Sequence, residues 1–431
     1  MKKTLFFLLF TIFINAQWSI STSERNALIS IYNQTDGANW SQSWDLEKDP
    51  YYWYGVKTSN GTVTELKLNG NLLKGNFPTS VFSLTNLKKL DLSSNKLHGE
   101  IPNLSSLSNL TYLNLSNNDF TGDVWSSYSN LPNLEEIYVG HNNCNISNTD
   151  FSGFSGLKSL DISKLNLTEI PASLGSLQKL SSLNVSNNAI VSFSNLSSLN
   201  QLQELNLANN NLNKVPSEII NFISLKSLDL SNNIITDFSS LSNLINLEWL
   251  SLENNSLQNI PNQVSNLQKL IHLNLGRNKI NGSTSILGTL NHLQQLWLNH
   301  NKLSGNIPQD LLALPNLMCL SLQSNELEGT IPNNIPQICN ISNNRFSKTQ
   351  IENYLNTNSN NTDFVYSPQR YDNPKVIKAN LNSSTSLDQA LSTSDGYSFT
   401  WLKTLDKNTY INSENLSISS VKETDLDRKS T

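Results

Sequence analysis

The sequence predicts an α/β solenoid with a long parallel β-sheet on its concave side, and two observations point to this fold. A phrase of 22 to 24 residues, LxxLxLxxNxL, occurs thirteen times between residues 63 and 346. Its Leu-x-Leu core has the period of a short β-strand, so the leucines face inward and the residues between them face outward. A repeat this short buries its leucines only against its neighbours, so the repeats must stack.

One position of the phrase is asparagine in every repeat but one. After each β-strand the chain turns away inside a dry interior. Backbone donors and acceptors at this turn are left without hydrogen-bond partners. An asparagine side chain carries both a donor and an acceptor, so a stacked column of asparagines satisfies these groups. Leu165 is the exception, and we expect a local gap at this rung. The position falls at residues 71, 95, 118, 142, 165, 188, 210, 233, 255, 278, 301, 325 and 344.

The return segments of several repeats carry a second phrase, LxGxIP. Glycine permits the tight bend, and proline favours an extended backbone that needs no ladder bond. This phrase resembles the plant-type leucine-rich repeats of receptor-kinase ectodomains and polygalacturonase-inhibiting proteins. The resemblance implies a leucine-rich repeat horseshoe, and strands about 4.8 Å apart would give it a concave sheet roughly 60 Å long. Copies of the phrase begin at Leu97, Leu303 and Leu327.

The first sixteen residues are typical of a secretory signal peptide. Lys2 and Lys3 precede an apolar run from Leu5 to Ile14, and Ala16 is a small residue at the expected cleavage point. A membrane anchor is the alternative, but the run is shorter than the roughly 20 residues that span a bilayer. The sequence therefore predicts an exported protein, secreted or at the cell surface, with no transmembrane segment after cleavage.

Both ends of a solenoid need caps, because their leucines would otherwise be exposed. We expect an N-terminal cap over residues 17–62, with a helix around Leu28 and a loop rich in tryptophan and tyrosine. With Trp40 and then Trp53 and Tyr54, this segment resembles the N-terminal module of bacterial surface leucine-rich repeat proteins. The chain as a whole resembles secreted and surface leucine-rich repeat proteins of Bacteroidetes. The N-terminal segment lacks the cysteine pair usual in plant caps, so aromatic packing would take that role. A carbohydrate site is the alternative interpretation of the same aromatic residues.

The C-terminal region divides into two predicted parts. Residues 347–374 form a cap and linker, in which Ile351 and Tyr354 indicate a brief helix and residues 364–374 the linker. In residues 375–431 apolar and polar residues alternate as they do in short strands. This segment resembles a truncated immunoglobulin-like module, which is a partial β-sandwich. Trp401 matches the tryptophan of strand C in that fold.

The charge and the cysteines of the chain limit its partners and its covalent cross-links. The net charge of −5 comes with no basic stripe, which argues against nucleic acid as a partner. Cys144 and Cys339 fall at inward positions and Cys319 at an outward one. A Cys319–Cys339 disulfide is disfavoured, because the strand registers point the two side chains to opposite faces.

Candidate catalytic residues form no motif. The five histidines pair with no nucleophile, and Asp91, Asp161 and Asp229 recur at one repeat position as solvated residues. We therefore expect no enzyme activity, no cofactor and no metal site.

Recognition of a binding partner is the class of function that remains. It depends on the side chains at the outward positions of the strands. Most of these positions hold small polar residues, yet two groups depart from the pattern. Exposed tryptophan flanked by charge is the usual make-up of an interaction hot spot, although a few aromatics could occur by chance. The predicted ligand-binding residues are Trp249, Glu253, His272, Arg277, Trp297 and His300, and a weaker group of Tyr112, Glu136, Tyr138 and His141. Trp249 and Trp297 are two repeats apart, which corresponds to about 10 Å.

The sequence thus predicts a non-enzymatic recognition protein whose concave face binds a protein or peptide ligand. Two alternatives stay open. A glycan-binding adhesin would stack sugars on the same tryptophans, and an inhibitor of a secreted hydrolase follows only from the similarity to polygalacturonase inhibitors.

Overall fold

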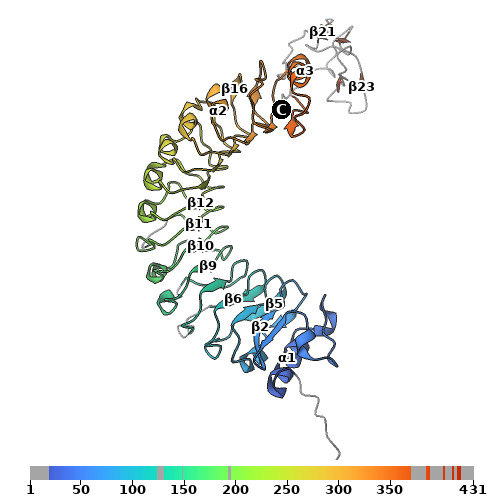
Figure 1. Ribbon diagram of the computed structural model, residues 1–431, viewed down its shortest axis with the longest axis vertical. Helices are drawn as coiled ribbons and strands as arrows, with labels where there is room; N and C mark the ends of the chain where they lie inside the picture. Colours follow the sequence, from blue (N-terminus) through green and yellow to red (C-terminus); the bar gives the residue numbers. More distant parts are fainter. Residues whose placement is uncertain are drawn as a thin grey trace, which may run out of the picture. The chain divides into compact units, whose positions relative to one another are not determined.

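The computed structural model describes residues 19–123, 131–147, 149–192 and 196–369, together with four short strands between 385 and 418. The chain forms two compact units, residues 1–251 and 252–431, and Figure 1 shows strands along one side of the repeats and short helical turns along the other. The predicted signal peptide lies outside the described residues, as does most of the predicted immunoglobulin-like segment.

Unit 1 is built on one long sheet. After an antiparallel hairpin of its first two strands, each strand is parallel to the one before it and one repeat further along the chain. The strands are β1 (Val56–Ser59), β2 (Thr62–Lys67), β4 (Lys89–Asp91), β6 (Tyr112–Asn114), β8 (Glu136–Tyr138), β9 (Ser159–Asp161), β10 (Ser182–Asn184), β11 (Glu204–Asn206), β12 (Ser227–Asp229) and β13 (Trp249–Ser251).

The return segments of unit 1 are mostly single 3₁₀ turns, since about five residues are too few for a stable α-helix. They are η3 (Thr79–Ser83), η4 (Phe151–Gly153), η5 (Ala172–Ser176), η6 (Ser217–Asn221) and η7 (Ser239–Asn243). A smaller parallel sheet joins the first repeats and consists of β3 (Lys74–Asn76), β5 (Lys96–Glu100) and β7 (Asp119–Thr121).

The N-terminal end of unit 1 carries a helix and two 3₁₀ turns, α1 (Thr22–Gln34), η1 (Gly37–Asn39) and η2 (Pro50–Tyr52). Ser21 caps α1 by accepting a hydrogen bond from the Glu24 N–H. Trp44 and Trp53 are buried and stack with their ring centroids 4.8 Å apart. Indole rings thus fill this end of the repeats, where a plant-type cap would carry cysteines.

Unit 2 continues the same repeat with further parallel strands. Its strands are β14 (His272–Asn274), β15 (Gln295–Trp297), β17 (Cys319–Ser321), β19 (Ile338–Asn340) and β20 (Phe364–Val365), with β16 (Ser304–Gly305) and β18 (Glu326–Leu327) pairing separately. The return segments are η8 (Asn262–Asn266), η9 (Ser285–Thr289) and α2 (Gln309–Leu312). Near the C-terminus, β21 (Thr385–Asp388) pairs with β24 (Asn415–Ile418), and β22 (Trp401–Leu402) with β23 (Tyr410–Ile411).

The end of the repeats in unit 2 differs from the expected linker. The helix α3 (Lys348–Thr357) starts with a capping box formed by Ser347 and Gln350. The chain then adds β20 parallel to β19, with Phe364 buried against Tyr354 at 4.6 Å between ring centroids. Residues 364 and 365 therefore belong to the sheet, because the aromatic at 364 fills the inward position that leucine holds elsewhere.

The inward residues confirm the predicted register. The central strand residues, such as Leu228 and Leu296, are completely buried. The asparagine ladder also exists: the Nδ2 group of Asn210 donates to the carbonyl groups of Val185, Leu207 and Ala208 at 3.1 to 3.2 Å. The Asn210 amide therefore ties its own repeat to the one before it.

The predicted gap at Leu165 is present. In a regular rung, the Oδ1 atom of Asn142 accepts a hydrogen bond from the N–H of Phe120 one repeat earlier, at 3.1 Å. The equivalent N–H after Asn142 is that of Cys144, which would need an acceptor from residue 165. Within the described residues the Cys144 N–H makes no hydrogen bond, and the Leu165 side chain is buried in place of an amide.

The three cysteines are free thiols. Burial raises the pKa of Cys144 and of Cys339 to about 12, with the charge of Cys319 adding to the effect on Cys339. Cys319 is half-buried on the outward side of β17. The predicted assignment of two inward thiols and one outward thiol is confirmed.

Candidate ligand-binding face

Each short strand presents two outward side chains, which we call the first and second outward positions; on β12 they are Ser227 and Asp229, on either side of Leu228. The second outward position is usually asparagine or aspartate, whose side-chain oxygen accepts a hydrogen bond from the N–H two residues later. This Asx turn helps the chain to leave the strand. The bonds, of 2.9 to 3.1 Å, link Asp91 to Ser93, Asn114 to Ser116, Asp161 to Ser163, Asn184 to Ser186, Asn206 to Ala208, Asp229 to Ser231, Asn274 to Gly276 and Asn340 to Ser342.

This geometry corrects the interpretation of the recurring aspartates. Asp91, Asp161 and Asp229 are turn-forming residues, and Asp91 is buried rather than solvated. Their recurrence thus has a structural cause that the repeat pattern alone does not reveal.

Two predicted site residues break this rule. Tyr138 on β8 and Trp297 on β15 occupy the second outward position, and neither side chain can form an Asx turn. Ser251 and Ser321 also depart but each keeps a hydroxyl group, and Lys67 on β2 and Val365 on β20 depart as well. Because local folding favours asparagine or aspartate at this position, the two rings require another explanation, and residues that break a local rule often mark functional sites.

Trp297 lies at a hollow of about 390 Å³ on the sheet of unit 2. Exposed apolar side chains continue from it, with Ile338 at 48% and Val365 at 46% exposure. The other lining residues are Glu253, Asn274, Asn299, Cys319, Leu320, Ser321, Gln323, Cys339, Asn340 and Asp363. Sequence reasoning missed Ile338 although it is at the first outward position beside Cys319, and it missed Asp363 and Val365 because that stretch has the features of a linker.

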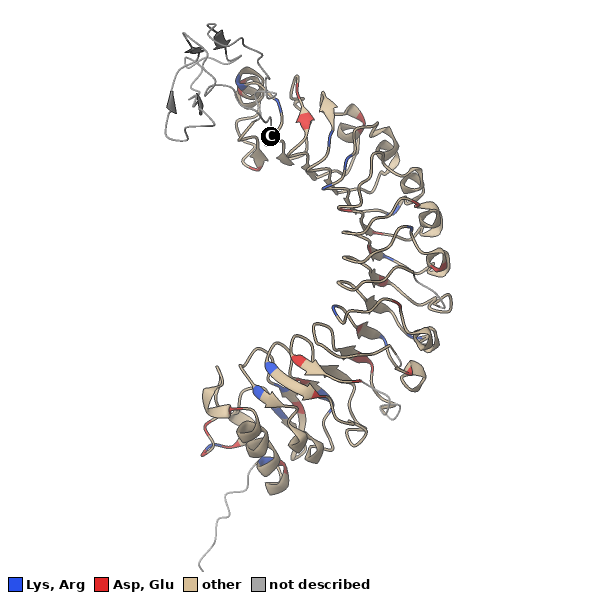
Figure 2. Ribbon diagram, turned by 180° about the vertical axis from the view of Figure 1, so that it is seen from behind, with Lys and Arg blue, Asp and Glu red and all other residues tan. Residues whose placement is uncertain are grey.

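Glu253 is held in place at the edge of the hollow. Its carboxylate pairs with the Arg277 guanidinium, with 3.1 Å between Oε1 and Nε, and accepts a hydrogen bond from Asn274 Nδ2 at 3.0 Å. Three of the predicted residues, Glu253, Arg277 and Trp297, are therefore brought to one region of unit 2. The site combines apolar side chains with charged groups that are held in place. Along the chain as a whole, acidic and basic residues are interspersed (Figure 2).

Four predicted residues lie beyond the strand that carries their repeat. Glu253, His141, Arg277 and His300 follow the strands, and the last three have φ angles of 57°, 52° and 53°. The equivalent residue is asparagine in most other repeats, since asparagine tolerates this left-handed conformation. The expectation that these four are strand residues was wrong, because the chain leaves the sheet three residues earlier than the phrase suggests.

The remaining members of the first group are strand residues outside the hollow. His272 is half-buried on β14, and Trp249 is half-buried on β13 at the edge of unit 1. The separation expected between Trp249 and Trp297 relates the two units and stays a prediction.

The second predicted group lies on unit 1, and the structure brings three of its members together. The rings of Tyr112 and Tyr138 are 5.6 Å apart, and Tyr138 donates to Glu136 at 2.9 Å. Burial, together with the hydrogen bond to Glu136 and its charge, raises the pKa of Tyr138 to about 12, although a hydrogen bond with Ser159 acts the other way. Tyr138 is therefore a neutral hydrogen-bonding group at physiological pH.

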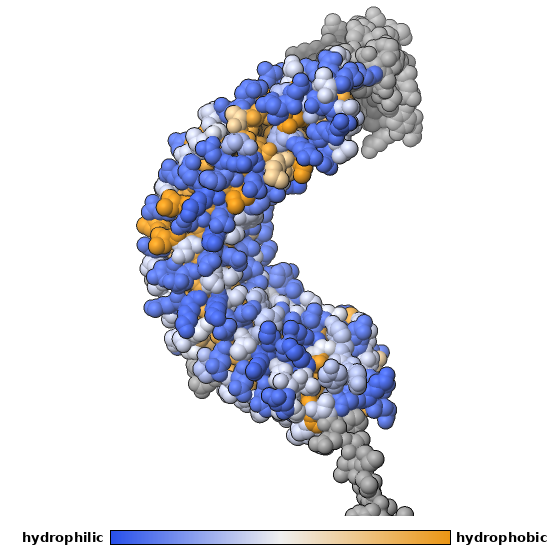
Figure 3. All heavy atoms as spheres, viewed as in Figure 1, coloured by the Kyte–Doolittle hydropathy of each residue, from blue (hydrophilic) through white to orange (hydrophobic). Residues whose placement is uncertain are grey.

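Other exposed apolar side chains lie away from the sheet face. In unit 1, Ile223 and Ile245 follow η6 and η7 at equivalent positions of consecutive repeats and are 62% and 58% exposed. Figure 3 shows such an apolar group over the turns. Neither side chain lines the hollow around Trp297.

Comparisons with known proteins place the repeats in a family. Leucine-rich repeat families match residues 85–124, 108–167, 155–212, 200–257 and 292–314. An inactive leucine-rich repeat receptor-like serine/threonine-protein kinase of Arabidopsis thaliana is 32% identical over 132 residues, which is 30% of this chain and 20% of that protein. The chain spans only 12% to 20% of the length of the first curated relatives.

Solved structures agree with this assignment. The ectodomain of the Arabidopsis receptor kinase HAESA, in complex with an N-terminal extended IDA peptide hormone ligand, has a TM-score of 0.61 at 29% identity and covers 75% of this chain and 57% of its own. A leucine-rich repeat protein of Leptospira interrogans has a TM-score of 0.59 at 27% identity, covering 68% of this chain and 75% of its own. The chain is a leucine-rich repeat protein, and it resembles the ectodomains of plant receptor kinases.

The described residues contain neither a candidate metal site nor a candidate membrane-spanning helix. They include no group of three or more histidine, cysteine, aspartate and glutamate side chains arranged to hold a metal ion. No helix in the same part of the chain is long and apolar enough to cross a membrane.

Proposed function

We propose that this protein is an exported, non-enzymatic recognition protein that binds a protein or peptide ligand on its sheet face. Trp297 carries the proposal: a large ring replaces the turn-forming asparagine at the edge of an apolar hollow. The similarity to HAESA supports the choice of ligand class, because that ectodomain was solved with a peptide hormone. Export rests on the N-terminal sequence, in which two lysines precede an apolar run.

The lining of the hollow suits one side of an extended peptide. Trp297, Ile338 and Val365 provide apolar contact area, while the carboxylate of Glu253 is already neutralised by Arg277. Asp363 is exposed and takes part in no ion pair within the described residues. We therefore expect a ligand with an apolar side chain over Trp297 and a basic or amide group toward Asp363.

The test is selection of binders from a displayed peptide library on the full chain, followed by affinity measurements on two matched variants. Trp297→Asn restores the common residue of this repeat position and should keep the fold while weakening binding by at least about 2 kcal/mol. Tyr138→Asn makes the same change on unit 1 and should leave binding unchanged. Loss of binding only in Tyr138→Asn would move the site to the Tyr112 group, and binding insensitive to both variants would refute a sheet-face site.

A further inference from the structure

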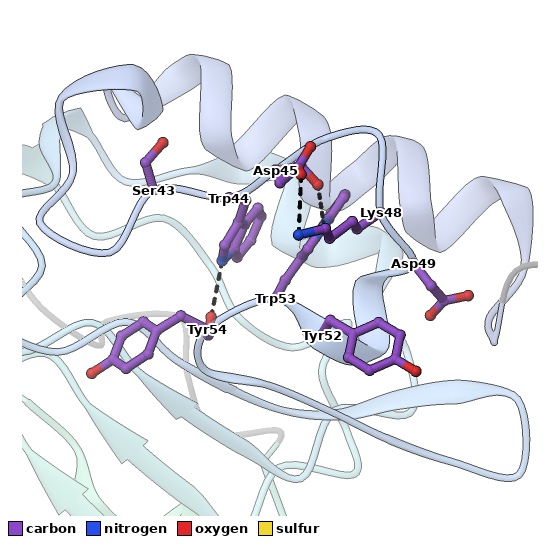
Figure 4. Close-up of a pocket in the computed structure, with 8 residues that line it drawn as sticks. All are labelled: Ser43, Trp44, Asp45, Lys48, Asp49, Tyr52, Trp53 and Tyr54. Carbon is purple, nitrogen blue, oxygen red and sulfur yellow. Dashed lines mark hydrogen bonds and ion pairs between the residues drawn. The ribbon is translucent and has the colours of Figure 1, made fainter.

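The N-terminal end of unit 1 has a second hollow, which the role of its aromatic residues in covering the repeats does not explain. It has a volume of about 620 Å³ and is lined by Ser43, Trp44, Asp45, Lys48, Asp49, Tyr52, Trp53 and Tyr54 (Figure 4). Trp44 and Trp53 are buried and cover the end of the repeats. Tyr52 and Tyr54 are not needed for that purpose, since they are 73% and 44% exposed.

The loop that carries these tyrosines is held firmly. The indole N–H of Trp44 donates to the carbonyl of Tyr54, and that of Trp53 donates to the carbonyl of Asp45, each at 2.9 Å. Gly55 follows with a φ of +75°, and a Cβ atom there would lie 1.9 Å from the Lys67 carbonyl oxygen. The two exposed rings are thus presented by a fixed backbone, with the indoles between them in Figure 4. A preorganised site loses less conformational freedom on binding.

The charged groups around the hollow are largely balanced. Asp45 pairs with Lys48 at 3.4 Å. Asp49 accepts hydrogen bonds from the N–H and hydroxyl groups of Ser19 and from the Tyr51 N–H at 2.5 to 2.8 Å. Burial raises the pKa of Asp49, but these hydrogen bonds and the charge of Arg25 outweigh it and hold the pKa below its usual range. The Asp49 carboxylate therefore remains an ionised acceptor.

This set of groups favours an uncharged, polyhydroxylated ligand. A nucleotide or other anion would need unpaired cations, whereas the one lysine of the hollow already faces Asp45. Sugar hydroxyl groups both donate and accept hydrogen bonds, so they match a mixture of carboxylates, an ammonium group and hydroxyls. The apolar face of a pyranose ring suits the face of an exposed aromatic side chain.

We propose that this hollow is a saccharide-binding site, in which Tyr52 and Tyr54 each stack on a pyranose ring and Asp45, Lys48 and Asp49 hydrogen-bond its hydroxyl groups. The site is separate from the sheet face, and it does not depend on the function proposed for that face. It would let one chain hold a glycan at its N-terminal end while the repeats engage another partner.

The experiment uses the full chain and four neutral probes: cellohexaose, laminarihexaose, maltohexaose and mannohexaose. Binding is measured by calorimetry and by intrinsic fluorescence, to which Trp44 and Trp53 at the hollow contribute among the eight tryptophans of the chain. At least one probe should bind the wild-type protein. Tyr52→Ala and Tyr54→Ala should each weaken that binding at least about tenfold, the equivalent of about 1.4 kcal/mol.

Two controls separate this site from its surroundings and from the sheet face. Tyr51→Ala removes a neighbouring ring that is 63% exposed but does not line the hollow, and it should weaken binding less than either tested variant. Trp297→Asn should leave saccharide binding unchanged, and Tyr52→Ala should leave peptide binding unchanged. The proposal is overturned if no probe binds at about 10 mM, the range of very weak affinity, or if both tyrosine variants bind like the wild-type protein.

Discussion

The inward and outward sides of the same strands differ in how much variation they show. The inward side repeats leucine or isoleucine at most strand centres, with Cys339 on β19 and Phe364 on β20, and these residues are buried. The outward side ranges from Ser227 to Trp249 in two neighbouring strands that share one register. Inward side chains must pack against the adjacent repeats, so their size and polarity are constrained in every repeat. Outward side chains are constrained only at the second outward position, by the Asx turn.

Function in such a repeat protein is therefore expected on the outward side. A departure on the inward side, such as Leu165, changes the packing of the chain itself. A departure on the outward side, such as Trp297, leaves the ladder intact and is free to serve a partner. We therefore expect changes on the inward side to alter stability and changes on the outward side to alter recognition.

The largest expected effect belongs to the inward side. Leu230 is completely buried in unit 1, and Leu230→Ala should lower the free energy of unfolding by about 2 to 5 kcal/mol by opening a cavity. Chemical denaturation of the full chain measures this change. A neutral result would mean that the leucine row does not pack as described.

The outward counterpart should affect binding rather than folding. Changing both Trp249 and Trp297 to serine should weaken peptide binding by at least about 2 kcal/mol, because Trp297 lies at the hollow where we expect an apolar side chain of the ligand. Both rings are half-buried, so we expect a loss of stability of only about 1 kcal/mol for each ring, well below a core truncation. Unfolding of the double variant would show that the rings are part of the core, and normal binding by a folded variant would exclude them from the site.

An intermediate effect is expected from the asparagine ladder. Asn210→Leu removes the amide that bonds Val185, Leu207 and Ala208, and the acceptor of the Ile190 N–H. Leaving these backbone groups unsatisfied should cost about 1 to 3 kcal/mol. The midpoint of denaturant unfolding tests this, and a shift within experimental error would refute the role of the ladder in stability.

The inward side of the strands is predictable from the sequence, whereas the outward side is predictable only in part, for a physical reason. Leucine and asparagine at fixed spacing determine register, strand direction and the ladder, so the repeat pattern alone identifies Leu165 as a gap. The hollow around Trp297 depends on residues from several repeats, including Val365 on β20. That strand escapes prediction because Phe364 replaces the expected leucine and the spacing of the last repeats is irregular.

The turn chemistry also escapes prediction. Asp91 and Asp229 resemble solvated residues in the sequence because their hydrogen bonds go to backbone groups two residues away, which no pattern of side chains reveals. His141 and Arg277 resemble strand residues because the phrase does not show where the backbone becomes left-handed. The asparagines that most other repeats carry at the equivalent position are the signal in the sequence that marks this left-handed residue.

The smallest expected effect comes from repairing the exception on the inward side. Leu165→Asn would supply an acceptor for the Cys144 N–H, a gain of about 1 kcal/mol for a satisfied backbone group. The same change removes a buried leucine side chain, and the lost burial of part of that side chain offsets the gain. The net change in the free energy of unfolding should therefore stay within about 1 kcal/mol, in contrast to the loss expected for Asn210→Leu. Hydrogen exchange of the Cys144 amide gives a second measurement, since the new bond should slow it even where global stability is unchanged. If exchange does not slow and the variant is strongly destabilised, the chain at this rung has adapted to leucine, and the gap is a packed feature rather than a missing bond.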